Sequence, residues 1–466
     1  MLKLFKEKLK PNKGNKSNDS IEKEEREEKQ EIVLELKDAI NYIQEKFINL
    51  EDFTTDYKQR LQSFAMSGDK KSRNIIKETI KKIIIENKVK VKGYTIEKLV
   101  DIVYADRYGL KILQKYYEDP KVDEIRVNKE DNIRIVKRGI PFEIEEKLNS
   151  EEDIETIIKR MIMDDIGVSL NKSNPTIESV LRDGSRLTAT CYPVSKSWNF
   201  ILRKHDSFEI TLENYIETKT LDEFTWNMLS LLAKGGTKML FSGNVGAGKT
   251  TLMKKVIGEV DKKLRIGVIG TDIEVNLQEY YPDRDIIELE EQLHLGVSMK
   301  ELFNTMLRES IDVLVIEEFR GSGEAIEAVR ACTRGIPNAF TTAHFNNPEE
   351  AIEGTALFML EEGLNLELDL AKLRVARAFN IVVQLFGDAI SGKKRLVSIT
   401  EVGVDKENKI FFNELLKWTP KTDNFLGEGE WIAVNQPSDT MLKNILKRAS
   451  RKEVEQLGWN TSKIKL

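Results

Sequence analysis

The sequence is poor in the residues that build disulfide frameworks and structural metal sites. It contains two cysteines, Cys191 and Cys332, which are far apart along the chain, and three histidines. Two cysteines without a close spacing form neither a disulfide framework nor a zinc motif. We therefore expect both thiols to be reduced and packed inside the fold.

Long apolar runs and an excess of positive charge are also missing. No segment reaches the ~18 apolar residues of a transmembrane helix, and residues 1–14 lack the apolar core of a signal peptide. The formal net charge is −5, which argues against a dedicated nucleic-acid-binding protein. We expect a cytoplasmic protein that reaches the inner face of the cell membrane only indirectly, through partners.

The chain is long enough to contain several domains. Its 466 residues, 40% of them hydrophobic, can bury two or three cores. Residues 1–30 are mostly charged, and we expect a disordered tail there. Apolar residues at helical spacing predict a helical bundle over 31–120. Alternating apolar and polar residues predict a small α+β domain over 121–206, followed by a linker at 207–220.

Residues 221–466 show a different texture, in which short apolar strands alternate with amphipathic helices. The expected strands are 238–243, 264–270, 312–318, 339–344, 381–386 and 395–402. This alternation predicts an α/β domain with a mostly parallel sheet that helices cover on both faces. The last part of the chain, about 50 residues long, is predicted to be a polar helical tail.

The strongest motif runs from Gly243 to Thr250 and reads G-N-V-G-A-G-K-T, which matches the P-loop pattern. Its glycines allow backbone N–H groups to surround phosphate oxygens, and the following helix points its positive end at them. Lys249 would reach the β and γ phosphates, and the Thr250 hydroxyl would bind Mg²⁺. We predict that ATP and Mg²⁺ bind here. The predicted nucleotide-binding residues are Gly243, Asn244, Val245, Gly246, Ala247, Gly248, Lys249, Thr250 and Thr251.

Two further signals follow the P-loop along the chain. The apolar segment from Val313 ends in Glu317 and Glu318, which is the Walker B pattern. Glu318 is the predicted catalytic base, and Glu317 is predicted beside it on the metal or its waters. His344 is the last residue of the next expected strand, at the sheet edge where nucleotides bind, and could sense the γ-phosphate.

The order of these motifs resembles the traffic ATPases of type II and type IV secretion and pilus assembly. The segments LRESIDVLVIEEFRGSGEA (307–325) and TTAHFNNPEEA (341–351) carry the likeness, together with VDEIRVNKEDNIRIVKRG (122–139) and NPTIESVLRDGSRLTATCYP (174–193). Within these ATPases the sequence looks most similar to the Tad pilus (CpaF-like) group. The likeness spans roughly residues 95–420, and it implies a RecA-like P-loop domain in subunits that form a homo-hexamer.

The resemblance also implies roles for individual residues. Glu318 matches the Walker B glutamate of the family, and His344 matches the histidine of its His box. Arg186 and Arg203 match N-domain arginines that approach the phosphates, where they would stabilise charge on the transferred phosphoryl group. Glu274 matches the later glutamate of the acidic segment. Arg320 matches the arginine that follows the Walker B glutamate.

The sequence departs from the family pattern near the predicted chemistry. Gly270 and Thr271 stand where the family has its first acidic pair, with Asp272 as a partial substitute. Glu317 stands where the family has glycine. The histidine expected within 333–335 is absent, and Ser310 replaces an arginine.

Three functions remain open at this stage. The leading one is an ATP-hydrolysing hexameric motor that acts on an inner-membrane platform protein of a pilus or secretion system. An ATP-binding scaffold with little hydrolysis is the first alternative, because of the altered acidic segment. A DNA-handling conjugation-type ATPase is the second, although the acidic chain lacks basic stretches interleaved with aromatic residues.

Overall fold

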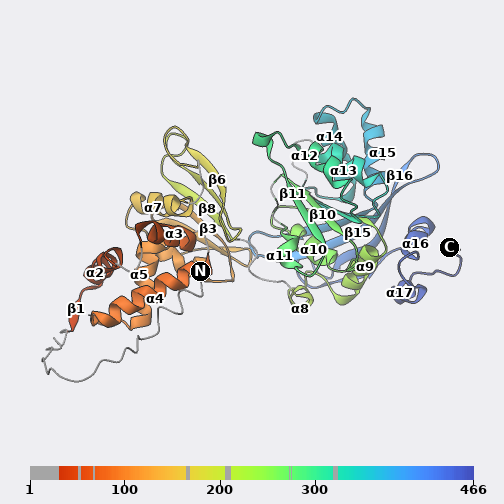
Figure 1. The fold of residues 1–466 in the computed structure, drawn as a ribbon. Coiled ribbons are helices and arrows are strands. Elements are labelled where there is room, and N and C mark those ends of the chain that lie inside the picture. The colour runs from red at the N-terminus through yellow and green to blue at the C-terminus, as the bar shows by residue number, and fades with distance from the viewer. Residues whose placement is uncertain are drawn as a thin grey trace, which may run out of the picture. The chain divides into compact units, whose positions relative to one another are not determined.

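The computed structural model describes residues 31–50, 54–66, 69–163, 168–204, 211–271, 273, 275–318 and 324–465. The charged tail at 1–30 lies outside these residues, as do Glu274 and Arg320. The chain divides into two compact units with a boundary between Gly109 and Leu110 (Figure 1). Each unit is described by itself.

The first unit is mainly helical. Its helices are α2 (Leu36–Ile48), α3 (Thr55–Met66), α4 (Lys70–Glu86) and α5 (Ile96–Tyr108). On α4, Ile76, Ile80 and Ile84 recur at helical spacing and are buried, so that this face packs against α2 and α5. A short parallel pair, β1 (Ile32–Leu34) with β2 (Val89–Val91), accompanies the helices and was not predicted from the sequence.

The second unit begins with an α+β domain whose core runs from Leu110 to Leu202. Six described strands form an antiparallel sheet in the order β5-β4-β3-β8-β7-β6. Helix α7 covers this core with Ile154, Ile157 and Ile158. The elements are η1 (Lys111–Leu113), α6 (Gln114–Glu118), β3 (Val122–Lys129), β4 (Asn132–Lys137), β5 (Ile140–Glu143), α7 (Glu151–Met161), β6 (Thr176–Val180), β7 (Arg186–Thr190) and β8 (Asn199–Arg203).

The remainder of the second unit is built on a large sheet. Among the described residues, nine strands follow the order β11-β10-β12-β13-β9-β14-β15-β16-β17. The pairings from β11 through β14 are parallel, and those from β14 through β17 are antiparallel. The strands are β9 (Lys238–Gly243), β10 (Ile266–Gly270), β11 (Ile286–Glu290), β12 (Val313–Glu318), β13 (Asn338–Ala343), β14 (Ile381–Gly387), β15 (Lys394–Val404), β16 (Ile410–Pro420) and β17 (Gly429–Ala433).

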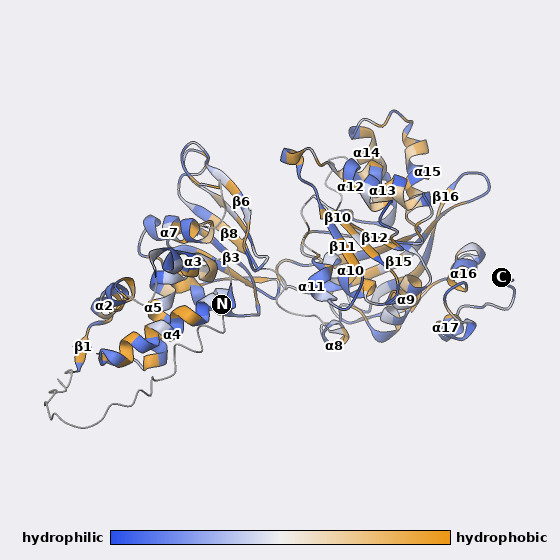
Figure 2. Cartoon of the chain, in the orientation of Figure 1, coloured by the Kyte–Doolittle hydropathy of each residue, from blue (hydrophilic) through white to orange (hydrophobic). Residues whose placement is uncertain are grey.

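Helices cover both faces of the large sheet. The helices of this part of the chain are α8 (Leu212–Glu217), α9 (Glu223–Lys234), α10 (Lys249–Ile257), α11 (Leu277–Tyr280), η2 (Leu293–Leu295), α12 (Met299–Met306), α13 (Glu324–Cys332), α14 (Pro348–Glu361), α15 (Leu368–Ala378), α16 (Asp439–Ile445) and α17 (Arg451–Gln456). Side chains of a strand alternate between faces: Val313 and Val315 join the core under α9 and α10, whereas Leu314 and Ile316 join the core under α12 to α15. The inner strands are accordingly hydrophobic (Figure 2).

The predicted fold class is confirmed: a P-loop α/β domain with a mostly parallel sheet follows a small α+β domain and a helical region. The C-terminal stretch differs from its helical prediction, because β16 ends and β17 lies within it before α16 and α17 begin. Both cysteines are buried and free, as expected. Within the described residues, no helix combines the length and hydrophobicity needed to cross a membrane.

Candidate functional site

The P-loop connects β9 to α10 at the carboxyl edge of the large sheet. Gly246 and Gly248 have φ values of 75° and 86°, a region that glycine enters without the cost other residues meet. Gly243 has φ 153°, and a Cβ there would lie 2.4 Å from the Leu385 carbonyl oxygen. No described side chain caps the first turn of α10, so its N–H groups stay available for an anion.

The end of strand β14 forms hydrogen bonds with this loop. The Asn244 Nδ2 donates to the Gly387 carbonyl oxygen at 2.7 Å, and the Gly387 N–H donates to the Asn244 Oδ1 at 2.9 Å. A Cβ on Gly387 would lie 2.8 Å from the Ala247 Cα. The sequence predicted Asn244 only as a member of the motif. Its contact with Gly387, 143 residues away, could not be predicted from any local sequence pattern.

Three predicted residues meet beside the loop. The Lys249 Nζ lies 3.1 Å from the His344 Nδ1 and donates to the Gly243 carbonyl oxygen at 3.1 Å. The His344 Nε2 contacts the Glu318 Oε1. The P-loop lysine, the histidine after β13 and the acid at the end of β12 therefore form one continuous chain of polar contacts.

Burial changes the chemistry of Lys249, which is 6% exposed. Removal from water lowers its pKa to about 8, the Glu318 carboxylate raises it in part, and the positive charge of Arg203 lowers it further. A buried ammonium of lowered pKa gains more than an exposed one from an anionic ligand. This site therefore favours a ligand that carries negative charge, such as phosphate.

Glu317 and Glu318 follow one another but take part in different contacts. Ile316 pairs with Thr341 and Glu318 pairs with Thr342, so Glu317 is an extra residue in a β-bulge. Glu317 is 6% exposed, and its Oε1 accepts the Val275 N–H at 2.5 Å. The bulge thus directs the two neighbouring carboxylates to separate partners.

The two predicted arginines of the α+β domain are placed on neighbouring strands. Arg186 begins β7 and pairs in register with Arg203, which ends β8. The positive charge of Arg203 contributes to the lowered pKa of Lys249. The structure brings these two arginines together. Their predicted contact with phosphates stays a prediction.

The residues present fit magnesium as a partner of a bound nucleotide. Among the described residues, no group of three or more His, Cys, Asp or Glu side chains forms a metal cage. Magnesium bound with nucleotides usually takes few protein ligands and completes its shell with phosphates and waters. The Thr250 hydroxyl, at the start of α10, has no hydrogen-bond partner in the described part of the chain and is free to serve.

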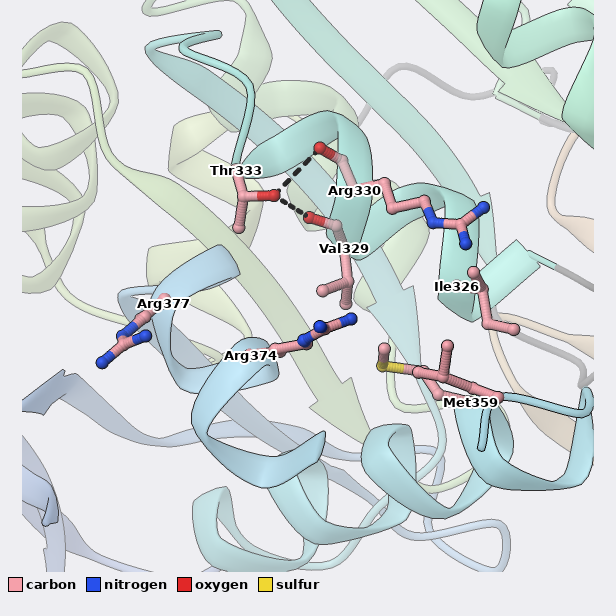
Figure 3. Close-up of a pocket in the computed structure, with 8 residues that line it drawn as sticks. Ile326, Val329, Arg330, Thr333, Met359, Arg374 and Arg377 are labelled. Atoms are coloured by element: carbon pink, nitrogen blue, oxygen red, sulfur yellow. Dashed lines mark hydrogen bonds between the residues drawn. The ribbon is translucent and has the colours of Figure 1, made fainter. Parts of the chain in front are cut away.

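A separate cavity of about 280 Å³ lies among α13, α14 and α15. It is lined by Ile326, Val329, Arg330, Thr333, Met359, Leu364, Arg374 and Arg377. Figure 3 shows the Arg374 side chain extending into this space between Val329 and Met359, whereas Arg377 points away from it. Lys249, Glu318 and His344 are not among its lining residues, so this cavity is distinct from the P-loop site.

A comparison with known protein families gives a match over most of the chain. Residues 109–407 match the family described as type II/IV secretion system protein. The chain belongs to this family. The match spans both the α+β domain and most of the P-loop domain, and it confirms the superfamily that the motif order resembled.

The chain is also similar to individual proteins. The type IV secretion system protein VirB11 of Brucella suis is 24% identical over 340 residues, which cover 65% of this chain and 91% of that protein. The type IV secretion system protein PtlH of Bordetella pertussis is 29% identical over 178 residues, 37% of this chain and 51% of that protein. The Legionella pneumophila ATPase DotB is similar in structure, with a TM-score of 0.41 and 14% identity over 64% of this chain and 77% of that one. The finer assignment to the Tad pilus branch stays a prediction.

Proposed function

We propose that this member of the secretion family is an ATPase that hydrolyses MgATP at its P-loop and drives a pilus or secretion machine. The observation that carries the proposal is the contact chain from Lys249 through His344 to Glu318. It combines a cation for phosphate, an acid able to accept a proton and a residue that touches both. Phosphoryl transfer needs little more than such positioning and charge stabilisation.

Each residue has a proposed role that follows from its surroundings. Lys249 exchanges its contacts with loop carbonyls and His344 for the β and γ phosphates of ATP. Glu318 accepts the proton of the attacking water, because its carboxylate lies at the edge where the phosphates would be. His344 holds Glu318 in place and reports the γ-phosphate to β13.

Magnesium would neutralise the β and γ phosphate charges. Thr250 is the proposed protein ligand. The predicted role of Glu317 at the metal is less favoured, because Val275 already engages one oxygen of that carboxylate. Arg186 and Arg203 are proposed to add positive charge to the phosphoryl oxygens in the transition state.

The proposed assembly is a homo-hexamer that acts on an inner-membrane platform protein. Family membership supports this proposal, as do the names of the secretion relatives. In a ring, closure of the α+β domain over bound ATP would turn hydrolysis into movement.

Hydrolysis measured against protein concentration tests the proposal. We expect MgATP turnover per chain to rise as the protein assembles, with assembly followed by analytical ultracentrifugation. Arg203→Ala should lower turnover while ADP affinity stays within about twofold, because the arginine acts on charge in the transition state. Arg134→Ala is the matched control, since this exposed arginine lies on β4 of the same domain.

Two results would contradict the motor. ATP binding without turnover at any concentration would favour the scaffold. Turnover that rises on addition of single-stranded DNA, but not with assembly, would favour the DNA-handling ATPase.

A further inference from the structure

Gly270 is the last residue of β10, and Glu317 is the last but one of the adjacent strand β12. Ile269 of β10 pairs with Ile316 of β12 in parallel register, and the next residue of each strand is Gly270 or Glu317. Both positions are among those at which the family resemblance predicts a different residue. Their proximity in space suggests that the two departures are related.

The space beside Gly270 is filled by the side chain of Glu317. A Cβ built on Gly270 would lie 2.8 Å from the Glu317 Oε2 and 3.2 Å from the Glu317 Cβ. Since real Cβ atoms essentially never approach below 3.0 Å, a side chain at 270 would require the end of the Glu317 side chain to move. In this structure the Glu317 carboxylate therefore occupies space that a side chain at 270 would need.

Glu317 also connects three segments at the sheet edge. Its Oε1 accepts the Val275 N–H from the loop after β10 at 2.5 Å. Its backbone carbonyl accepts the Thr342 hydroxyl of β13 at 2.8 Å. Because Glu317 is the bulged residue of β12, these contacts determine where the next residue, Glu318, is held.

We propose that Glu317 is a positioning residue that holds the Val275 amide and the site of Glu318, and that Gly270 leaves room for its carboxylate. A buried carboxylate is costly unless donors satisfy it, and the Val275 N–H is such a donor. The pair 270/317 then acts as one unit. The kinetic consequence rests on the proposed ATPase function, whereas the link to Val275 exists without nucleotide.

The link is tested first, by hydrogen exchange of the Val275 amide in the full chain without nucleotide. Val275 is fully buried. Loss of a charge-assisted bond in Glu317→Ala should speed exchange of this amide by about tenfold to a hundredfold. Glu317→Gln keeps an acceptor oxygen on the same stem and should retain most of the protection. Unchanged exchange in Glu317→Ala would overturn the proposal, whether or not the chain hydrolyses ATP.

The pairing of the two positions is tested by a double-mutant cycle on the same amide. Gly270→Ala should speed exchange with Glu317 intact, because the added methyl group displaces the carboxylate. In the Glu317→Ala background the same substitution should add nothing. Glu288→Ala is the matched control, because the Glu288 carboxylate also accepts a backbone N–H, that of Leu277, at 2.6 Å. Any effect of Glu288→Ala on exchange of the Val275 amide should add to the effect of Gly270→Ala. If the effects of Gly270→Ala and Glu317→Ala on Val275 exchange add, the two residues do not act together.

The consequence for turnover is tested last. Glu317→Ala should lower kcat by about tenfold or more, since a small displacement of a catalytic group is costly, while ADP affinity stays within about twofold. Glu317→Gln should restore most of kcat. A wild-type chain without turnover would refute the proposed function and leave the exchange results standing. A kcat unchanged in Glu317→Ala beside fast Val275 exchange would refute the positioning role.

Discussion

The support that β14 gives the P-loop should be measurable as nucleotide affinity. The Asn244 amide exchanges two hydrogen bonds with the Gly387 backbone, at 2.7 and 2.9 Å. Each such bond contributes about 1 kcal/mol net. If both act on the bound conformation of the loop, Asn244→Ala should weaken ADP binding by about 2 kcal/mol, or about 30-fold. Because covalent connection to β9 and α10 still restrains the loop, a loss of about 5- to 30-fold is expected.

Isothermal titration calorimetry with ADP checks this expectation, and Gly387→Ala provides a steric counterpart. The added Cβ would lie 2.8 Å from the Ala247 Cα, so this substitution should shift the loop and weaken ADP at least as much. Asn435→Ala is the control, because this amide also donates to a backbone carbonyl, that of Glu414, at 3.0 Å. If Asn244→Ala binds ADP within about twofold of wild type, while its melting temperature is unchanged, β14 does not preorganise the loop.

Three further outcomes follow from the structure. Because the pKa of Lys249 is about 8, its positive charge is lost as the pH rises above that value. ADP affinity should therefore fall between pH 7.5 and pH 9.5. Lys249→Arg should make ADP affinity less dependent on pH. Arg395 is 1% exposed, and its guanidinium carbon lies 4.0 Å from the Trp418 ring centroid. The guanidinium also donates to the Leu426 carbonyl oxygen at 2.9 Å. Arg395→Ala should lower the free energy of unfolding, measured by urea denaturation, by about 3–5 kcal/mol. His344→Ala releases Glu318 and should lower kcat by about tenfold or more, with little change in ADP affinity, as a steady-state assay would show.

The sequence predicted the central sheet well because buried parallel strands are continuous apolar runs. All six expected strands of the P-loop domain are present, from β9 to β15. The missed strands lie toward the edges of the sheet. The segment of β11 mixes isoleucine and glutamate and is only partly buried, so its apolar signal is weak. Strands β16 and β17 extend the other edge of the sheet by antiparallel pairing. No local sequence pattern predicted these two strands.

The candidate site was predictable in position but not in its contacts. The carboxyl ends of parallel strands meet at one edge, which is why Lys249, Glu318 and His344 could be expected near one another. The two hydrogen bonds between Asn244 and Gly387 join residues far apart in the sequence, so they depend on the tertiary fold. The fit of Glu317 beside Gly270 likewise depends on strand register and a bulge, which sequence spacing does not specify.

The most direct test of the account compares ATP binding and hydrolysis in Glu318→Gln and Lys249→Ala with the wild-type chain in Mg²⁺. Glu318→Gln should bind ATP with an affinity within about threefold of wild type but release phosphate about 10²-fold or more slowly, because it lacks the general base. Lys249→Ala should lose most of its ATP affinity. Phosphate release at the wild-type rate from Glu318→Gln, or unchanged ATP binding by Lys249→Ala, would contradict the proposed site.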